Sequence, residues 1–281
     1  ILVIVSSLKP DYPSFHSADL PHSVEILTEE TDRYAALGAA AQRADQSQRR
    51  WTLTEIKQFY DDYFKFINEH ADFKSVLELG CGTGEIAIRL AKAGKEIYAT
   101  DLSKDMLEVS RLKAMEADVN LLLGRVDMTD FVTDKAVDLI LCLCDSINYV
   151  LSKKKVLRTF KNVYESLKYN GTFIFDVDSL YKMDEILDGY FEEEDADDFY
   201  FKWHVEKTAL GKVEHEIEII DKENNEHIKE MHYQQTYDIE IYLSLLKQAG
   251  FTDVQYYGEF EEYHDKSQRI IFICHKRRGG K

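Results

Sequence analysis

Three glycines at alternate positions, Gly80, Gly82 and Gly84, directly follow an apolar run, in a pattern typical of turns that hold a nucleotide. The dinucleotide fingerprint, G-x-G-x-x-G, would place its third glycine at position 85, where this chain has Glu85. A carboxylate at the start of a helix competes with a phosphate for the same backbone amides. The turn therefore disfavours a dinucleotide and favours a ligand without phosphate, particularly one that carries positive charge.

Acidic residues and methionines around the following apolar runs suit the other parts of a nucleoside. Asp101 can accept hydrogen bonds from both hydroxyls of a ribose, and Asp127 can accept one from an adenine amino group. Met106 and Met128 can lie against a purine ring, and Glu78 lies just before the glycines, near the same crevice. The sequence thus predicts a nucleoside site that lacks a phosphate subsite.

Short apolar runs alternate with helical spacing over residues 51–183, and these elements must position the candidate side chains. Two further strands within residues 237–278 are expected to pair as an antiparallel hairpin at the sheet edge. The pattern predicts an α/β fold with a doubly wound, mostly parallel, seven-stranded sheet, whose ligands collect at the carboxyl ends of the strands. The last helix before the fifth strand is expected to span residues 153–171 and to end at Asn170-Gly171. The five core strands are "SVLELG", "EIYATD", "VNLLLGRVD", "AVDLILCLC" and "TFIFDVD".

Residues 184–236 interrupt this core as an insertion after the fifth strand. Its acidic run, residues 184–198, is expected to form a solvated loop, or alternatively to attract a cationic acceptor. Period-two alternation follows, with turns at Leu210-Gly211 and Asn224-Asn225, and predicts three antiparallel strands. Residues 1–50 form an N-terminal extension, part of which could be a helical lid.

Composition narrows the class of partner. The formal net charge is −17, which repels phosphate backbones and anionic membranes at long range and disfavours nucleic acid. No apolar stretch approaches the length of a membrane span. Four cysteines without paired metal-ligand spacing favour a reducing, cytoplasmic compartment and no metal site.

The chain resembles the class I S-adenosylmethionine-dependent methyltransferases in motifs that occur in the order of that family: "VLELGCGTG", "ATDLSKDML", "GRVDM", "VDLILCL", "LKYNGTFIFD" and "LLKQAGF". The resemblance covers residues 51–276 and implies the Rossmann-like fold and S-adenosylmethionine as cofactor. It implies that the glycine turn surrounds the amino acid end of the cofactor, that Asp101 and Leu102 hold the ribose, and that Asp127 and Met128 hold the adenine. The expected cofactor contacts are Glu78, Gly80, Cys81, Gly82, Gly84, Asp101, Leu102, Met106, Asp127, Met128 and Cys144.

The same resemblance places the loop "CDSINY", after the fourth strand, beside the donor methyl group. Its candidates for orienting the acceptor are Asp145, Ser146, Asn148 and Tyr149. The loop lacks the prolines of family members that methylate amino groups of nucleobases or of protein glutamine. The insertion resembles that of small-molecule members, including sugar N-methyltransferases and glycine-methylating enzymes, and could also build a homodimer. By this analogy Trp203, His204, Tyr233 and Tyr237 could face the acceptor, and the predicted catalytic residues are Asp145, Tyr149 and His204.

The leading hypothesis is therefore methyl transfer to a nitrogen or oxygen nucleophile of a small molecule by in-line displacement. A second hypothesis is methylation of tRNA or rRNA, for which the only dense basic runs are residues 153–155 and 276–278. A third is a non-enzymatic S-adenosylmethionine-binding module that regulates a partner.

Overall fold

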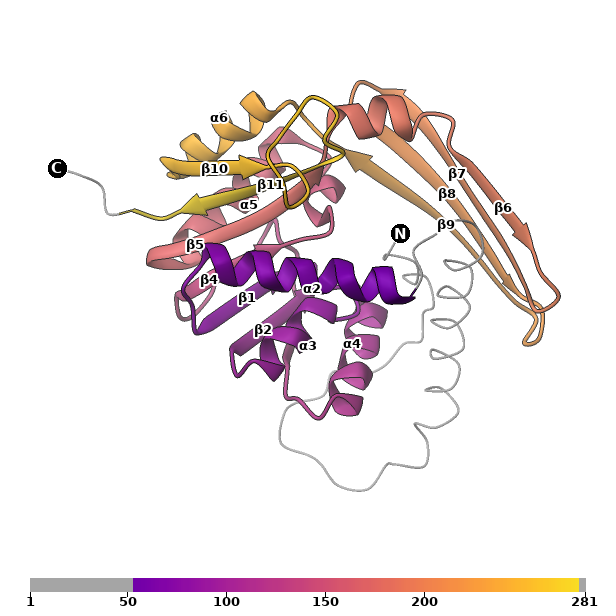
Figure 1. Ribbon diagram of the computed structural model, residues 1–281, viewed down its shortest axis with the longest axis horizontal. Helices are drawn as coiled ribbons and strands as arrows, with labels where there is room; N and C mark the ends of the chain where they lie inside the picture. The colour runs from indigo at the N-terminus through magenta and orange to yellow at the C-terminus, as the bar shows by residue number, and fades with distance from the viewer. Residues whose placement is uncertain (1–52, 278–281) are drawn as a thin grey trace.

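The computed structural model describes residues 53–277, so the extension at residues 1–50 lies outside the described part of the chain. A seven-stranded sheet forms the core, in the order β10-β11-β5-β4-β1-β2-β3 (Figure 1). Strand β11 runs antiparallel to both neighbours, whereas the other pairings are parallel, which confirms the predicted mostly parallel sheet and its edge hairpin. The strands are β1 (Ser75–Leu79), β2 (Glu96–Asp101), β3 (Leu122–Arg125), β4 (Val137–Cys142), β5 (Leu167–Asp178), β10 (Asp253–Tyr257) and β11 (Arg269–His275).

Helices cover both faces of this sheet because each presents an apolar stripe to it. On one face, α2 (Leu53–His70) crosses the strands beside α3 (Glu85–Lys92) and α4 (Lys104–Glu116) (Figure 1). On the other face lie α5 (Lys153–Ser166) and α6 (Ile239–Ala249). No helix within residues 53–277 is both long and apolar enough to cross a membrane.

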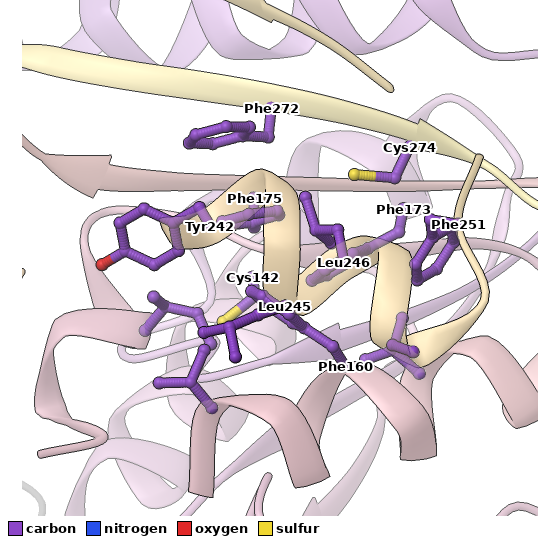
Figure 2. Close-up of a cluster of buried hydrophobic side chains, with 14 of the residues drawn as sticks. Cys142, Phe160, Phe173, Phe175, Tyr242, Leu245, Leu246, Phe251, Phe272 and Cys274 are labelled. Atoms are coloured by element: carbon purple, nitrogen blue, oxygen red, sulfur yellow. The ribbon is translucent and has the colours of Figure 1, made fainter. Parts of the chain in front are cut away.

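Stacked aromatic rings anchor α5 and α6 to the sheet (Figure 2). The Phe175 ring stacks on Phe173 and on Phe272, each at a centroid distance of 4.8 Å. Phe160 and Tyr242 bring the two helices onto the same cluster. Fully burying a phenylalanine is worth about 1.5–3 kcal/mol, so this cluster holds the carboxyl end of β5 in place.

The predicted end of the helix at Asn170-Gly171 is wrong. Helix α5 ends at Ser166, and β5 begins at once, because Leu167 already pairs with Val137 of β4. Pairing resumes between Thr172 and Leu139, so residues 168–171 form a bulge within the strand. The Asn-Gly pair is a turn signal, as expected, but it makes a bulge in the strand instead of ending the helix.

The insertion forms a second sheet of four antiparallel strands, not three (Figure 1). The strands are β6 (Phe191–Asp195), β7 (Phe199–Ala209), β8 (Lys212–Asp221) and β9 (Glu226–Gln235). The additional strand and a π-helical turn, Lys182–Ile186, occupy much of the acidic run that was expected to be a loop. Strand β6 could not be predicted because glutamates occupy both of its faces. Glu192 is buried and Glu193 is exposed, so the sequence lacks the apolar–polar alternation that indicates a strand. The turns at Gly211 and Asn225 are confirmed by their left-handed backbone.

Candidate functional site

A cavity of about 1470 Å³ lies where the order of the core strands reverses, between β1 and β4, and continues beneath the insertion sheet. Its walls come from the turn after β1, the loops after β2, β3 and β4, and the inner faces of β7, β8 and β9. The cavity thus joins the expected cofactor site to the expected acceptor site in one continuous space.

The glycine turn after β1 needs glycine for conformation and for space. Gly80, Gly82 and Gly84 all have left-handed backbones, with φ values of +69°, +52° and +81°. A Cβ atom on Gly80 would lie 2.6 Å from the Ser146 Oγ, whereas one on Gly82 would meet no atom within 4 Å. The turn therefore packs directly against the loop after β4 at Gly80.

This difference gives a matched pair of variants. Gly82→Ala should destabilise the protein by about 1–2 kcal/mol, the cost of a left-handed alanine. Gly80→Ala should cost about 1–3 kcal/mol more, because Ser146 must also move. Urea unfolding of the protein without cofactor measures both free energies. Equal losses in the two variants would contradict the packing of Gly80 against Ser146.

Glu85 occupies the position where a dinucleotide site would have glycine, and two cations fix its side chain. Its carboxylate pairs with Arg89 at 2.7 Å and with Lys113 at 2.8 Å. Although burial opposes it, Lys113 and Arg89 together hold the pKa of Glu85 below its ordinary value. Glu85 is thus a stable anion at the helix start, which agrees with a ligand that lacks phosphate there.

Asp101 ties the first two cofactor loops together. Its carboxylate accepts one hydrogen bond from the Gly82 amide and one from the Ser103 amide, each at 2.9 Å. A carboxylate has about four acceptor sites, so two remain for the hydroxyls of a ribose in the cavity. Ser103 in turn caps α4, which places Met106 at the cavity wall.

Glu78 is a buried carboxyl group that is suited to pairing with a cationic group of a ligand. Its side chain is only 3% exposed, and its Oε2 atom has no hydrogen-bond partner among the described residues. Burial, together with the neighbouring Asp101, raises the pKa of Glu78 to about 8. A ligand ammonium group would supply the missing partner and favour the ionised carboxylate.

Binding of S-adenosylmethionine should therefore release protons. Below pH 8 Glu78 is largely protonated, and an adjacent ammonium group would lower its pKa, so we expect release of close to one proton near pH 7. Calorimetric titration in buffers of different ionisation enthalpy counts these protons. Glu78→Gln should abolish the release, and a wild-type protein that binds without releasing protons would contradict this role.

Of the other expected cofactor residues, four also line the cavity, whereas Gly84 does not and instead packs against Ser110 of α4. Met106 is buried, Met128 is half-buried, and Leu102 and Asp127 are exposed. Although burial opposes it, the hydrogen bond from the Thr129 amide holds the pKa of Asp127 below its ordinary value, so Asp127 is ionised and can accept from an amino group.

The two cysteines that line the cavity are neutral thiols. Burial, reinforced by nearby carboxylates, raises the pKa of both Cys81 and Cys144. Both can contact the cofactor, but neither is a nucleophile at neutral pH, because only the thiolate reacts.

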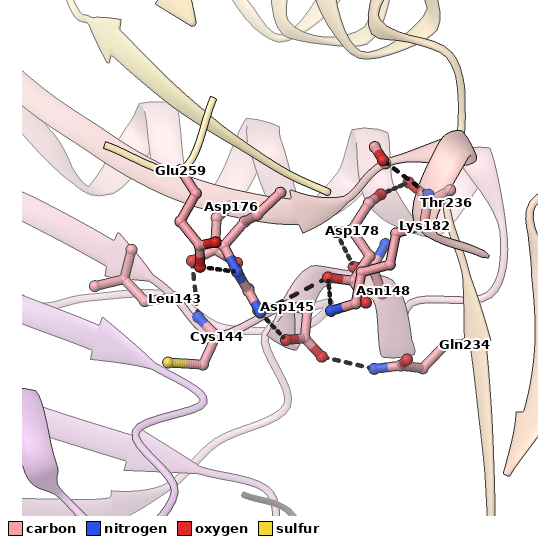
Figure 3. Close-up of polar contacts among 12 residues, drawn as sticks. Leu143, Cys144, Asp145, Asn148, Asp176, Asp178, Lys182, Gln234, Thr236 and Glu259 are labelled. Carbon is pink, nitrogen blue, oxygen red and sulfur yellow. Dashed lines mark hydrogen bonds and ion pairs between the residues drawn. The ribbon is translucent and has the colours of Figure 1, made fainter. Parts of the chain in front are cut away.

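The loop after β4 is held in a strained shape by Asp176 at the end of β5 (Figure 3). Cys144 and Asp145 both have left-handed backbones, with φ of +53°. Their amides donate to the two carboxylate oxygens of Asp176 at 2.8 and 2.6 Å, and the Tyr63 hydroxyl donates to the same carboxylate at 2.6 Å. Such strain persists only where the surroundings fix it, and here it aims the loop into the cavity.

Arg269, the first residue of β11, is the centre of a buried charge cluster. It contacts Asp176 directly, Asp145 at 3.0 Å, Glu259 at 3.6 Å and Asp178 at 3.7 Å. The second cation of the cluster is Lys182, 2.8 Å from Asp178. Four carboxylates thus surround two cations, and all of these side chains except Asp176 line the cavity.

The structure separates the predicted acceptor residues into two groups. Asp145, Ser146, Tyr149 and Trp203 line the cavity. The others lie elsewhere: His204 is on the opposite face of β7 beside Phe191, Tyr233 is exposed, and Tyr237 is in the core.

Asn148 has a structural position. It is fully buried, donates to the Gln235 carbonyl at 3.0 Å and accepts from the Asp178 amide at 2.9 Å. Asn148 therefore joins the loop to the base of the insertion and does not line the cavity.

A hydrogen-bonded chain from the insertion reaches the loop after β4, and its central members were not among the predicted site residues. The Trp203 indole donates to His215 Nδ1 at 3.2 Å, His215 Nε2 lies 3.1 Å from the Gln234 amide oxygen, and the Gln234 amide donates to Asp145 at 2.8 Å. Burial lowers the pKa of His215 to about 4, so His215 is neutral at neutral pH. The sequence signal for these residues was the period-two alternation along β8 and β9, which places His215, His232 and Gln234 on one face of the sheet. The structure shows that this face lines the cavity.

Comparison with known proteins places this geometry in context. Residues 76–171 match the family described as a methyltransferase domain. A protein of Geobacillus sp. (strain WCH70), named as a methyltransferase, is 37% identical over 72% of this chain and 85% of its own length. The glycine/sarcosine N-methyltransferase of Aphanothece halophytica is 28% identical over 75% of this chain and 78% of its own length. The crystal structure of an S-adenosylmethionine-dependent methyltransferase from Clostridium acetobutylicum ATCC 824 superposes with a TM-score of 0.72, at 24% identity, over 88% of this chain and 99% of that one.

Proposed function

This chain belongs to the class I S-adenosylmethionine-dependent methyltransferases, and we propose that it methylates an amine nitrogen of a small, cationic acceptor. The observation that carries the proposal is the excess of carboxylates at the acceptor side of the cavity. Asp145, Asp178 and Glu259 line that side against Arg269 and Lys182, and Asp176 lies behind them.

The described residues fit the cofactor. Glu78 provides a buried partner for an ammonium group, Asp101 provides acceptor sites for ribose hydroxyls, and Asp127 provides an acceptor for an adenine amino group. Met106 and Met128 provide apolar contact for the ring. When bound, S-adenosylmethionine supplies a methyl group on a positively charged sulfur.

Charge balance favours a cationic acceptor over a neutral one. A largely buried cluster with two more carboxylates than cations is costly unless a further positive charge or a proton joins it. Burial, to which the neighbouring Asp145 adds, raises the pKa of Asp178 against the opposing effect of Lys182 and Arg269. A protonated amine bound against Asp145 and Glu259 would neutralise the surplus, whereas an alcohol or an anion would not.

The relative that is named a glycine/sarcosine N-methyltransferase gives independent support for nitrogen as the acceptor atom. The acidic residues at positions 184–198 do not contribute to this surplus, because only Ile186, Leu187 and Tyr190 of that run line the cavity. We therefore propose that Asp145, Asp178 and Glu259 attract the cation, and not the acidic residues 184–198 that were expected to do so.

The protein's contribution to rate is alignment and exclusion of water. Asp145 is fixed by Arg269 and Gln234, so its position relative to the acceptor is set before the acceptor binds. Tyr149 and Trp203 close the cavity with apolar surface. Holding two reactants in line in such a site can supply on the order of 7–11 kcal/mol of the barrier.

Transfer of labelled methyl from S-adenosylmethionine tests the proposal. Glycine, sarcosine and an aminosugar are compared with glycolate and the corresponding hydroxyl sugar, and bulk tRNA at low salt serves as the nucleic-acid alternative. We expect label in the amines only. Label in hydroxyl compounds or in RNA, and none in any amine, would overturn the proposal.

Glu259→Gln extends this test to the cluster. We expect this variant to raise the KM for the acceptor amine several-fold, which corresponds to the loss of about 1 kcal/mol from a partly exposed charge pair. The affinity for S-adenosylhomocysteine should stay unchanged. Glu261→Gln is the matched control, because Glu261 lies two residues away and pairs with the exposed His264. Equal effects of the two variants would count against a role of the cluster in acceptor binding.

A further inference from the structure

A second histidine of the cavity, His232 on β9, forms a buried pair with Glu230 on the same face of the same strand. Its Nε2 atom lies 2.9 Å from the Glu230 carboxylate, and the two side chains are 9% and 6% exposed. The His232 ring lines the cavity and meets the Tyr149 ring edge to face at 6.0 Å. We infer that His232, oriented by Glu230, is the base that removes the proton from the acceptor; this inference depends on the proposed amine acceptor.

The pair with Glu230 fixes which nitrogen of His232 can act. A carboxylate accepts hydrogen bonds, so the proton of the neutral imidazole lies on Nε2 and the lone pair lies on Nδ1. Within residues 53–277, no hydrogen bond to that Nδ1 atom is present. His232 therefore has a basic atom available at a wall of the cavity.

Two other candidate bases beside His232 are already engaged. His215, which pairs with His232 across the strands, accepts from Trp203 at one ring nitrogen and faces the Gln234 oxygen with the other. Asp145 accepts from Arg269 at one oxygen and from Gln234 at the other. Proton removal by His215 would break a buried hydrogen bond, and protonation of Asp145 would weaken its pairing with Arg269, whereas removal by His232 would break no hydrogen bond.

The step is balanced without any further reactant. An ammonium acceptor gives one N–H proton to His232 Nδ1, and its freed lone pair forms the bond to the methyl carbon as the carbon–sulfur bond breaks. The electron pair of that bond leaves with sulfur, and the product is a methylated ammonium ion beside neutral S-adenosylhomocysteine. The imidazolium then passes its proton to solvent when the product leaves.

The groups that face His232 come from three elements besides its own strand. Glu230 contacts it on its own strand, neutral His215 lies opposite on β8, and Tyr149 meets it from the loop after β4. Asp105, at the start of α4, lies close enough to Glu230 for the two carboxylates to interact, and burial together with Glu230 raises the pKa of Asp105. Glu230 is thus a positioning residue, because its contact fixes the orientation and the tautomer of the His232 ring.

Kinetics with sarcosine as the acceptor test the inference. His232→Gln should lower kcat/KM by about 100-fold or more, the usual worth of a general base, and should leave the affinity for S-adenosylhomocysteine unchanged. Because a base must be neutral to accept a proton, kcat/KM of the wild type should rise with pH, and His232→Gln should remove this rise. Glu230→Gln should also lower kcat/KM, since the ring is then less firmly oriented.

The exposed pair of His227 with Glu218, at 2.7 Å, provides matched controls. His227→Gln and Glu218→Gln should leave the pH profile unchanged. Nitrogen-15 NMR of the protein without acceptor reports the tautomer directly, with His232→Gln identifying the signal, and neutral His232 should carry its proton on Nε2.

Two results would overturn the inference: a neutral His232 that carries its proton on Nδ1, or a His232→Gln variant whose kcat/KM stays within about threefold of wild type. Failure of the proposed function is distinguishable, because it would leave the wild type unable to methylate any amine.

Discussion

Replacing Asp101 with alanine is expected to weaken binding of S-adenosylmethionine by about 100-fold or more, because two charge-assisted hydrogen bonds to the ribose would be lost, each worth about 1.5–3 kcal/mol. Asp101 also holds the Gly82 and Ser103 amides, so the free protein should lose a smaller amount of stability. Calorimetric titration with S-adenosylmethionine and S-adenosylhomocysteine measures the affinities, and urea unfolding measures the stability.

Asp101→Asn separates shape from charge. It keeps the size of the side chain, so its stability should lie close to wild type while its affinity falls toward that of the alanine variant. Asp127→Asn provides the comparison at the adenine end, where an exposed side chain should give a smaller loss of affinity. A folded Asp101→Ala protein with wild-type affinity would contradict the assignment of the ribose site.

Replacing Arg269 with methionine should destabilise the fold by about 3–5 kcal/mol, the usual cost of removing one partner from a buried ionic cluster. The reason is that Asp145, Asp176, Asp178 and Glu259 would then face one another with Lys182 as their remaining cation in the cluster. Urea unfolding at pH 7 measures the loss. Arg277→Met is the matched control, because Arg277 makes a 2.8 Å pair with Asp253 at the surface and should cost less than about 1 kcal/mol.

The stability defect of Arg269→Met should also shrink as the pH falls. In the wild type, although burial opposes it, Arg269 holds the pKa of Asp145 below its ordinary value. That pairing contributes stability above the ordinary pKa of an aspartate and loses it as the pH falls through the lowered one. In the variant, protonation of the carboxylates instead relieves their repulsion, so wild type and variant should converge in acid. A defect that is constant with pH would indicate lost packing rather than uncompensated charge.

The core fold was predictable because its elements are strongly patterned. The run around Ile140 is continuously apolar, as a buried parallel strand must be, and the run around Leu77 is interrupted only by Glu78. The glycine turn marks the first junction of strand and helix. The errors arose where a local signal had two physical outcomes. Asn170-Gly171 can end a helix or make a bulge, and pairing of Leu167 with β4, a tertiary interaction, decides for the bulge.

Most of the expected cofactor residues were found from the order of the motifs and from the family resemblance, because they lie at or just after the ends of core strands, and they line one cavity. The charge cluster was not, because Arg269 and Asp145 are 124 residues apart and meet only when β11 inserts beside β5. An arginine at the start of the apolar strand "RIIFICH" was the available signal. His204 was predicted to be catalytic, and His215 and His232 were not. Period-two alternation shows which residues share a face of the sheet, but it does not show which face is turned to the cavity.

A crystal structure with S-adenosylhomocysteine and the acceptor amine before its methylation tests the central proposal most directly. The amine nitrogen should face Asp145 and Glu259 and lie about 3–3.5 Å from the position of the transferred methyl group, in line with the sulfur. The adenine should lie between Asp127 and Met106. A cofactor bound in this orientation with no acceptor density near the carboxylate cluster, and with the sulfur open to another face of the protein, would contradict the account.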